Sequence, residues 1–307
     1  MLGYVLRRFA TMIPVLFIAV TACFFILRLA PGGPFDGERP LPPAVQANLN
    51  AHYNLDKPLV QQYFIYVGNV LAGDLGPSFI SEDFDVAEQI AIGLPYTMIV
   101  AVLALGVALI VGIVAGVFGA LYQNSMPDYL IAAIILLGLV LPNFLIAPIL
   151  QLIFGVRLDW LPVGGWGDGS PQYLVLPVIV LAWSHAARIS RLMRGSMIEV
   201  LNANYIRTAR AKGIGPRLMI SRHAIKPALL PVVSYLGPAA SYLLTGSLVV
   251  EQIFGIPGIG RFFINAALSR DYGMVLGTVI FYMVLIVILN LLVDIAYAYL
   301  DPKVRTQ

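Results

Sequence analysis

The sequence has 307 residues, of which 59% are hydrophobic and 11% are charged, and its formal net charge is +3. A soluble domain has roughly a quarter of its residues charged, so this composition excludes an ordinary water-soluble fold and indicates a protein dissolved in a lipid bilayer. The small net charge gives no reason to expect a nucleic-acid partner, and the single cysteine, Cys23, excludes a disulfide within the chain.

Six apolar stretches are long enough to cross a membrane, so we expect an all-α polytopic membrane protein with six transmembrane helices. The first is too long for the core of a cleavable signal peptide and is interpreted as an anchor. The fourth is the shortest and carries His185 near its predicted end, where we expect a satisfied helix-end residue rather than a proton carrier. The stretches are 9–30, 94–120, 129–154, 173–187, 228–250 and 274–300.

Charge placement predicts the orientation of these helices. If both termini lie in the cytosol, most Lys and Arg residues fall on the cytosolic side, as the positive-inside rule requires, and most acidic residues fall outside. The chain then divides into an N-terminal transmembrane anchor (1–30), an external segment with short helices (31–93) and a core of five helices (94–300). A cytosolic loop (188–226) interrupts the core, and a cytosolic tail (301–307) follows it.

The external segment contains "PLVQQYFIYVGNVL", in which apolar residues recur at helical spacing. We interpret this stretch as an amphipathic helix packed on the outer ends of the spans. A docking surface for an external protein is the alternative. The predicted apolar face consists of Leu59, Tyr63, Phe64, Val67, Val70 and Leu71.

The sequence lacks the groups that would let this chain act alone as a pump or an enzyme. None of its lysines follows a glycine, so it has no Gly-Lys-[Ser/Thr] phosphate-binding loop. Ion-driven transporters usually carry ionisable groups in mid-membrane, whereas Arg28, His185 and Asp294 are all expected near helix ends. We also find no catalytic constellation and no cluster with metal-ligand spacing. We therefore expect no catalytic residues, no metal site and no nucleotide hydrolysis in this chain.

The cytosolic loop holds nine Lys/Arg residues and one acidic residue. Placing nine such residues in the bilayer at about 3 kcal/mol each would cost roughly 27 kcal/mol, so the loop is predicted to lie outside it. Apolar residues at helical spacing predict that the fourth span continues into the cytosol. Gly213 is typical of a helix C-terminus, and Gly215-Pro216 of a turn that starts a second helix, which we expect to end near residue 226.

The loop is thus predicted to form a helix–tight turn–helix element with basic side chains around a small tip. We interpret it as inserting into a groove of a cytosolic partner, where its cations could meet acidic side chains. Basic charge that only fixes topology, or that contacts anionic lipid, is the alternative. The compact Gly/Ala turn favours docking.

Three stretches, "YIRTARAKG", "RHAIKPALLP" and "EQIFGIPGIGRFFINAALSRDY", resemble the membrane permeases of bacterial peptide-importing ABC transporters. The stretches "RLAPGGPFDGERPLPP" and "GDLGPSF" resemble the B-type permeases of oligopeptide systems in particular. The resemblance covers essentially the whole chain and implies the type I ABC importer permease fold in the bacterial cytoplasmic membrane. It also implies a second (C-type) permease subunit, two ATP-binding subunits that hold ATP and Mg, an extracytoplasmic peptide-binding protein, surrounding membrane lipid, and no cofactor in this chain.

The resemblance identifies the cytosolic loop as the EAA loop, which carries the coupling helix of such permeases. This chain has Arg-Thr-Ala where the family has Glu-Ala-Ala, so a role assigned to that glutamate cannot be carried over. The closing Ile-x-Leu-Pro of the family is also absent, and Ile-Lys-Pro at 225–227 is the nearest equivalent. The resemblance assigns coupling to the ATPases to Arg207, Thr208, Ala209, Arg210, Ala211, Lys212, Gly213, Gly215 and Pro216.

The fifth span carries a polar seam. Ser234, Ser241 and Thr245 share one helical face, and Tyr235 and Tyr242 form a parallel row one residue further on. A seam of this kind suits a pathway wetted for a peptide backbone, with Ser234, Ser241, Tyr242 and Thr245 as the candidate residues. Close helix packing through small residues and interhelical hydrogen bonds is the alternative, and the pattern alone favours it.

The stretch "FGIPGIGRFF" interrupts an apolar region on the predicted external side. A broken segment there would suit an external gate, and a plain turn is the alternative. The candidate gate residues are Gly255, Pro257, Gly258 and Gly260.

The function implied by the resemblance is that of a permease subunit of an ATP-driven oligopeptide importer. The same architecture could carry dipeptides, nickel complexes or opines, and the sequence discriminates poorly among these cargoes. A self-sufficient channel or ion-coupled carrier is a rival from another class, against which the lack of mid-membrane charges argues. A membrane enzyme is a weaker rival for want of a catalytic constellation.

Overall fold

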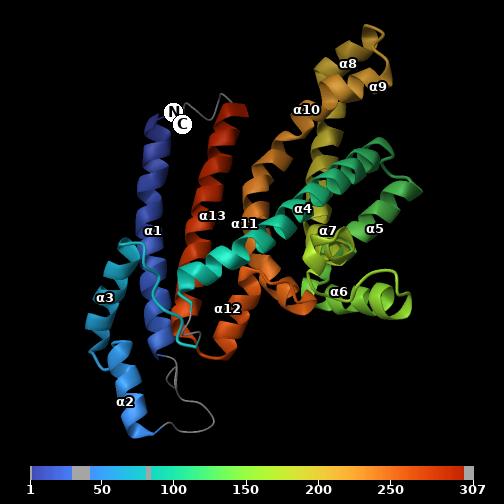
Figure 1. Cartoon of the computed structure of the whole chain (residues 1–307). Helices are drawn as coiled ribbons and strands as arrows, with labels where there is room; N and C mark the ends of the chain where they lie inside the picture. The colour runs from blue at the N-terminus through green and yellow to red at the C-terminus, as the bar shows by residue number, and fades with distance from the viewer. Residues whose placement is uncertain (1, 30–41, 81–83, 301–307) are drawn as a thin grey trace. The chain divides into compact units, whose positions relative to one another are not determined.

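The computed structural model describes residues 2–29, 42–80 and 84–300, and the regular structure of this part is helical apart from one isolated β-bridge between Pro77 and Asp85 (Figure 1). The chain divides into two units. The first comprises Met1–Thr97 and Pro257–Leu291, and the second comprises Met98–Ile256 and Leu292–Gln307. The predicted tail 301–307 and most of the motif "RLAPGGPFDGERPLPP" lie outside the described residues.

Five helices of the described chain are long and apolar enough to cross a membrane. Their positions confirm five of the six predicted spans. The second begins ahead of its predicted start at residue 94, because the helix continues through Pro95 instead of starting beside it. The five are α1 (Leu2–Leu29), α4 (Val86–Leu121), α7 (Pro171–Leu201), α11 (Leu230–Phe254) and α13 (Tyr272–Leu300).

The remaining predicted span, 129–154, is not one continuous helix. The structure has α5 (Met126–Val140), then α6 (Asn143–Leu150), which runs into a π-helix (Gln151–Arg157). The two parts are bent by 109°. The cause is the Leu141-Pro142 pair: Leu141 takes an extended conformation with φ −81° and ψ 123°, as residues before proline prefer, and proline offers no N–H to continue the helix.

His185 was expected near a helix end, and this expectation is wrong. It lies in the middle of α7, which runs on to Leu201 without a break. The predicted continuation of the fourth span as a helix is thereby confirmed, and its cytosolic location stays a prediction. The helix persists beyond the hydrophobic stretch because Ile189, Met193 and Met197 recur at spacings of four and are fully buried on one face.

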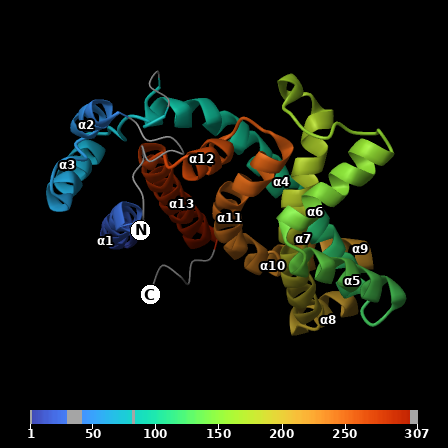
Figure 2. The same cartoon turned by 90° about the horizontal axis from the view of Figure 1, so that it is seen from below.

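In the first unit, α3 (Leu59–Leu71) packs against α1, and the two lie side by side in both views (Figures 1 and 2). The contact is aromatic: the rings of Phe24 and Tyr63 meet edge-on at 5.5 Å, and the Tyr63 hydroxyl lies 2.7 Å from the Thr21 hydroxyl. The predicted apolar face is only partly correct. Tyr63 is buried, whereas Phe64 and Leu71 are exposed, because α1 covers a narrower strip of α3 than the apolar pattern offers.

Two hydrogen-bonded anchors fix the short elements of the first unit, which also contains α2 (Pro43–His52) and α12 (Ile259–Leu268). Asp271 caps α13: its Oδ1 accepts from the backbone N–H groups of Met274 and Phe79, each at 3.0 Å. Its Oδ2 accepts from the Ser78 hydroxyl, so one carboxylate holds the 78–79 segment at the start of α13. At the start of α12, the Ile259 N–H donates to Thr97 Oγ1 at 3.0 Å.

In the second unit, α7 packs against both α5 and α11, and two glycines let α4 approach it closely. A Cβ atom at Gly112 would lie 2.8 Å from the carbonyl oxygen of Ala186, and one at Gly116 would lie 2.7 Å from that of Ser190. The glycines are four residues apart, so they lie on one face of α4. This is the small-residue packing by which helices associate in a membrane.

Replacing Gly116 by alanine is therefore expected to destabilise the second unit by about 1–2 kcal/mol, because the new methyl group would force α4 and α7 apart. The matched control is Gly106→Ala in the same helix, where nothing lies within 4 Å of the added Cβ. The measurement is the midpoint of thermal unfolding in detergent. A midpoint for Gly116→Ala equal to that of the control would contradict the packing argument.

Candidate functional site

A cavity of about 610 Å³ lies in the second unit between the α5–α6 break, α7 and α11. Two of the four predicted pathway residues, Tyr242 and Thr245, line it. Ser234 and Ser241 are not among its lining residues: Ser234 is exposed and donates to the Leu230 carbonyl, and Ser241 is buried. Only part of the predicted polar seam therefore lines the cavity, namely Tyr242 and Thr245.

The wall of the cavity is a connected cluster of aromatic and basic side chains from α7 and α11. His185 Nδ1 lies 2.9 Å from the Tyr235 hydroxyl, and its ring meets that of Tyr242 edge-on at 5.2 Å. The Arg188 guanidinium carbon lies 5.7 Å from the centre of the Tyr235 ring, within cation–π range. Sequence reasoning missed the role of Arg188 and His185 in this wall. The sequence signal for this role is that the two residues are three apart on one helix and therefore share a face. In the structure that face lies opposite the tyrosine row of the fifth span.

Two polar atoms of this wall are buried without a partner. Ser184 Oγ and His185 Nε2 have no hydrogen-bond partner among the described residues. Buried polar groups in native proteins nearly always have one, so each such atom calls for a ligand, a water molecule or a rearrangement. The hydroxyl of Thr245, by contrast, donates to the Ser241 carbonyl at 3.0 Å. The wall thus has unused hydrogen-bonding capacity beside Arg188.

The segment 161–165 packs against the C-terminal end of α11, just before the candidate gate, and forms hydrogen bonds with it. The Gly165 N–H donates to the Phe254 carbonyl at 2.6 Å, and a Cβ at Gly164 would lie 2.7 Å from the same oxygen. Gln151 Nε2 donates to the Val163 and Ile253 carbonyls at 2.7 and 3.3 Å. The last turn of α11 is therefore held by backbone contacts on two sides.

The candidate gate residues form a helix end followed by a helix start. Gly255 closes α11 with a left-handed φ of +67°, and the Ile256 N–H returns to the Glu251 carbonyl at 2.9 Å. Gly258 precedes α12 in an extended conformation, and Gly260 lies in its first turn. Pro257 joins the two and belongs to the first unit with α12. Whether this turn works as a gate stays a prediction.

The loop predicted to be cytosolic contains the expected hairpin, with α8 (Asn204–Ala211) and α9 (Pro216–Met219) beyond the C-terminal end of α7 (Figure 1). Gly213 has φ +77°, and its N–H donates to the Arg210 carbonyl while the Ile214 N–H donates to the Ala209 carbonyl. This pair of bonds is the Schellman motif that ends a helix. The predicted second helix runs past residue 226 and is in three pieces, because a π-helical turn (Ile220–Ala224) separates α9 from α10 (Ile225–Ala228).

The hairpin exposes its cations and buries only part of its apolar side chains, because Tyr205 and Leu218 are 48% and 47% exposed. Ile206, Ala209 and Met219 are buried. Of the residues assigned to coupling, all except Ala209 are exposed, namely Arg207, Thr208, Arg210, Ala211, Lys212, Gly213, Gly215 and Pro216. The exposed surface of the hairpin therefore combines basic side chains and small residues with two apolar side chains, and its docking role stays a prediction.

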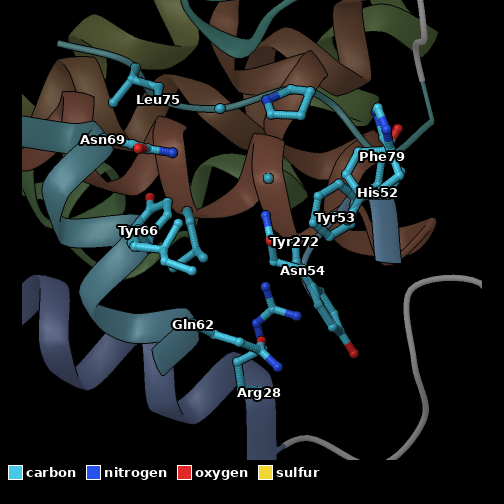
Figure 3. A pocket seen from close by; sticks show the side chains of 15 residues that line it. Arg28, His52, Tyr53, Asn54, Gln62, Tyr66, Asn69, Leu75, Phe79 and Tyr272 are labelled. Carbon is cyan, nitrogen blue, oxygen red and sulfur yellow. The ribbon is translucent and has the colours of Figure 1, made fainter. Parts of the chain in front are cut away.

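A second cavity, of about 120 Å³, lies in the first unit around Arg28 (Figure 3). Figure 3 shows the guanidinium pointing into the space flanked by Tyr66, Asn54 and Tyr272. Its carbon lies 5.5 Å from the ring centre of Phe24 and 5.7 Å from that of Tyr272. Burial raises the pKa of the Tyr66 phenol. At this volume the cavity is too small for a peptide, so it is not a pathway candidate.

The class of protein follows from comparing the arrangement of the helices with that in solved structures. A chain of the MetNI methionine ABC transporter, solved in inward-facing conformations, matches this structure with a TM-score of 0.55 over 68% of this chain and 93% of that chain. At 17% sequence identity the match shows the fold alone, which is that of a type I ABC importer permease. No group of three His, Cys, Asp or Glu side chains that could hold a metal occurs among the described residues.

The chain belongs to the family of binding-protein-dependent transport system inner membrane components, which matches residues 108–306. It is 48% identical over 305 residues to the oligopeptide transport system permease protein OppB of Haemophilus influenzae and to that of Escherichia coli K12, with 99% of this chain and 100% of each relative aligned. It is 40% identical over 305 residues to the dipeptide transport system permease protein DppB of Bacillus subtilis, with 99% and 98% aligned. The chain is therefore a multi-pass protein of the inner membrane.

Proposed function

We propose that this chain is the permease subunit of an ATP-driven importer for oligopeptides, and that it forms the translocation pathway with a second permease. The observation that carries the proposal is the 48% identity with OppB proteins over 99% of the chain. Dipeptides are the second candidate cargo, because dipeptide permeases align over the same length at 40% and 37% identity.

The cavity in the second unit is the candidate section of the pathway in this chain. Its volume of about 610 Å³ falls in the range of sites that hold small organic ligands. Tyr242 and Thr245 contribute polar groups to it, as expected of a path for a peptide backbone. The fold supports this assignment because α7 and α11, which form the cavity, flank the hairpin and would move with it.

The hairpin is the candidate coupling element. Its exposed basic surface would dock into a groove of an ATP-binding subunit, and the two such subunits of the importer would hold ATP and Mg, since this chain has no phosphate-binding loop. An external peptide-binding protein would deliver the cargo, and both termini would lie in the cytosol. ATP binding could bias the inward-facing and outward-facing states only if the partner has different affinities for them.

Reconstitution into vesicles tests the proposal. We expect peptide-stimulated ATP hydrolysis and uptake from the chain together with a second permease, two ATP-binding subunits and a peptide-binding protein, and neither activity from the chain alone. Oligopeptides and dipeptides compared in the same assay identify the cargo. Nucleotide hydrolysis by the isolated subunit, or uptake without any ATPase, would overturn the proposal and favour a self-sufficient carrier or channel.

A further inference from the structure

The charged lining of the cavity in the second unit is positive. Among the described residues that line it, Arg188 is the only one with a charged side chain, and no acidic side chain is present to neutralise it. A cation in a cavity that is partly screened from water attracts an anion more strongly than it would in bulk water. The cavity should therefore prefer a ligand with an anionic group.

The start of α6 adds potential of the same sign. Pro142, Asn143 and Phe144, at the N-terminal end of this helix, line the same cavity. Helix N-termini carry partial positive charge from their aligned peptide dipoles. The break at Leu141-Pro142 is what brings this helix end to the cavity, because a continuous helix would have no terminus there.

The Arg188 side chain is exposed, and its guanidinium has a defined contact on the wall of the cavity. Its guanidinium stacks over the Tyr235 ring, and the Tyr235 hydroxyl is in turn fixed by His185 Nδ1. Beside it, the unpartnered Ser184 hydroxyl offers a further hydrogen-bond donor. A fork of guanidinium donors with a neighbouring hydroxyl is the arrangement that binds carboxylates well.

The size of the cavity separates two kinds of anion. A volume of about 610 Å³ is far more than an isolated small anion fills. It is in the range of sites that hold organic ligands as large as a short peptide. The anionic group is therefore expected to be one end of a larger, otherwise neutral or apolar ligand. A peptide fits this description through its C-terminal carboxylate.

We propose that Arg188, with Ser184 and the Tyr235–His185 pair beside it, binds the C-terminal carboxylate of the transported peptide and so selects for peptides with a free C-terminus. This inference rests on the proposed function. It assigns to Arg188 a specificity role in the candidate pathway, separate from docking by the hairpin, although Arg188 opens the same run of basic residues.

The test compares a peptide that has a free C-terminus with the same peptide as its C-terminal amide. Uptake of both is measured with the assembled complex in vesicles for the wild type, Arg188→Gln and the control Arg191→Gln, whose exposed side chain does not line the cavity. We expect Arg188→Gln to lower uptake of the free-acid peptide by about tenfold to a hundredfold, the worth of a charge-assisted hydrogen bond. The amide should change by less than about threefold, and the control variant should alter neither peptide.

The ratio of acid to amide uptake isolates the interaction, because any discrimination by the peptide-binding protein is common to every variant and cancels. Equal losses for both peptides in Arg188→Gln would overturn the inference while leaving the proposed function intact. Absence of uptake in the wild-type complex would instead overturn the proposed function. If Arg188→Gln fails to assemble, Arg188→Lys is measured instead, because it keeps the charge but loses the guanidinium fork. A reduced preference for the free-acid peptide in Arg188→Lys supports the inference, and an unchanged preference contradicts it.

Discussion

Replacing Gly213 by proline is expected to reduce ATP-driven uptake at least tenfold, with the membrane helices still folded. Gly213 has φ +77°, whereas the proline ring fixes φ near −65°. Proline also removes the N–H that donates to the Arg210 carbonyl at 2.9 Å, so the Schellman motif that turns α8 toward α9 cannot form. Since nothing lies within 4 Å of a Cβ at this position, the effect comes from the backbone and not from a clash within the chain.

Two control variants separate this backbone requirement from a general sensitivity of the loop. Gly213→Asn should keep most of the uptake, because asparagine tolerates the left-handed conformation. Gly215→Ala should do the same, because Gly215 has an ordinary φ of −61° and open space around it. The readouts are uptake, peptide stimulation of ATP hydrolysis, and co-purification of the ATP-binding subunits. A fully assembled Gly213→Pro complex with wild-type uptake would show that the hairpin does not couple the two processes.

The local elements of this fold were predictable because each depends on residues close in sequence. The continuation of α7 follows from Ile189, Met193 and Met197 at spacings of four, a pattern that does not depend on what packs against it. The end of α8 follows from Gly213 because few other residues adopt its conformation. Even the break before α6 has a local cause in Leu141-Pro142, but hydropathy averaged over a span conceals it.

The site was predictable only in part, because it depends on which helix faces lie opposite one another. The polar seam of the fifth span identifies Tyr242 and Thr245 as well as Ser234, and only packing against α7 decides that the first two line the cavity. His185 and Arg188 were interpreted from hydropathy, as a helix-end residue and the first of a cytosolic run. Their contacts to Tyr235, fifty and forty-seven residues away, give them a different role.

Arg194, in the basic loop, is a second case in which a contact between helices changes the role expected from the sequence. The sequence counts it among the cations that could meet acidic groups of a partner, but the structure pairs it within the chain. Its Nε and Nη2 donate to Asp128 Oδ1 and Oδ2 at 2.8 and 2.7 Å, a bidentate pair that joins the start of α5 to α7. Asp128 is only 3% exposed and also accepts from the Asn124 N–H at 3.0 Å. The positive charge available for docking is thus concentrated in the hairpin, beyond residue 202.

Replacing Asp128 by asparagine is expected to destabilise the second unit by about 1–2 kcal/mol, because it removes a charge-assisted bidentate pair whose Arg194 side chain is 32% exposed and so keeps part of its hydration. Removing both charges in Asp128→Asn/Arg194→Gln should cost less than the sum of the two single variants, since the double variant leaves no unpaired charge. The control Arg191→Gln, at an exposed position three residues from Arg194, should change stability by no more than about 0.5 kcal/mol. Chemical unfolding in detergent measures all four proteins. Additive losses in the double variant would mean that the two side chains stabilise the helices independently, and would exclude this ion pair as the link between α5 and α7.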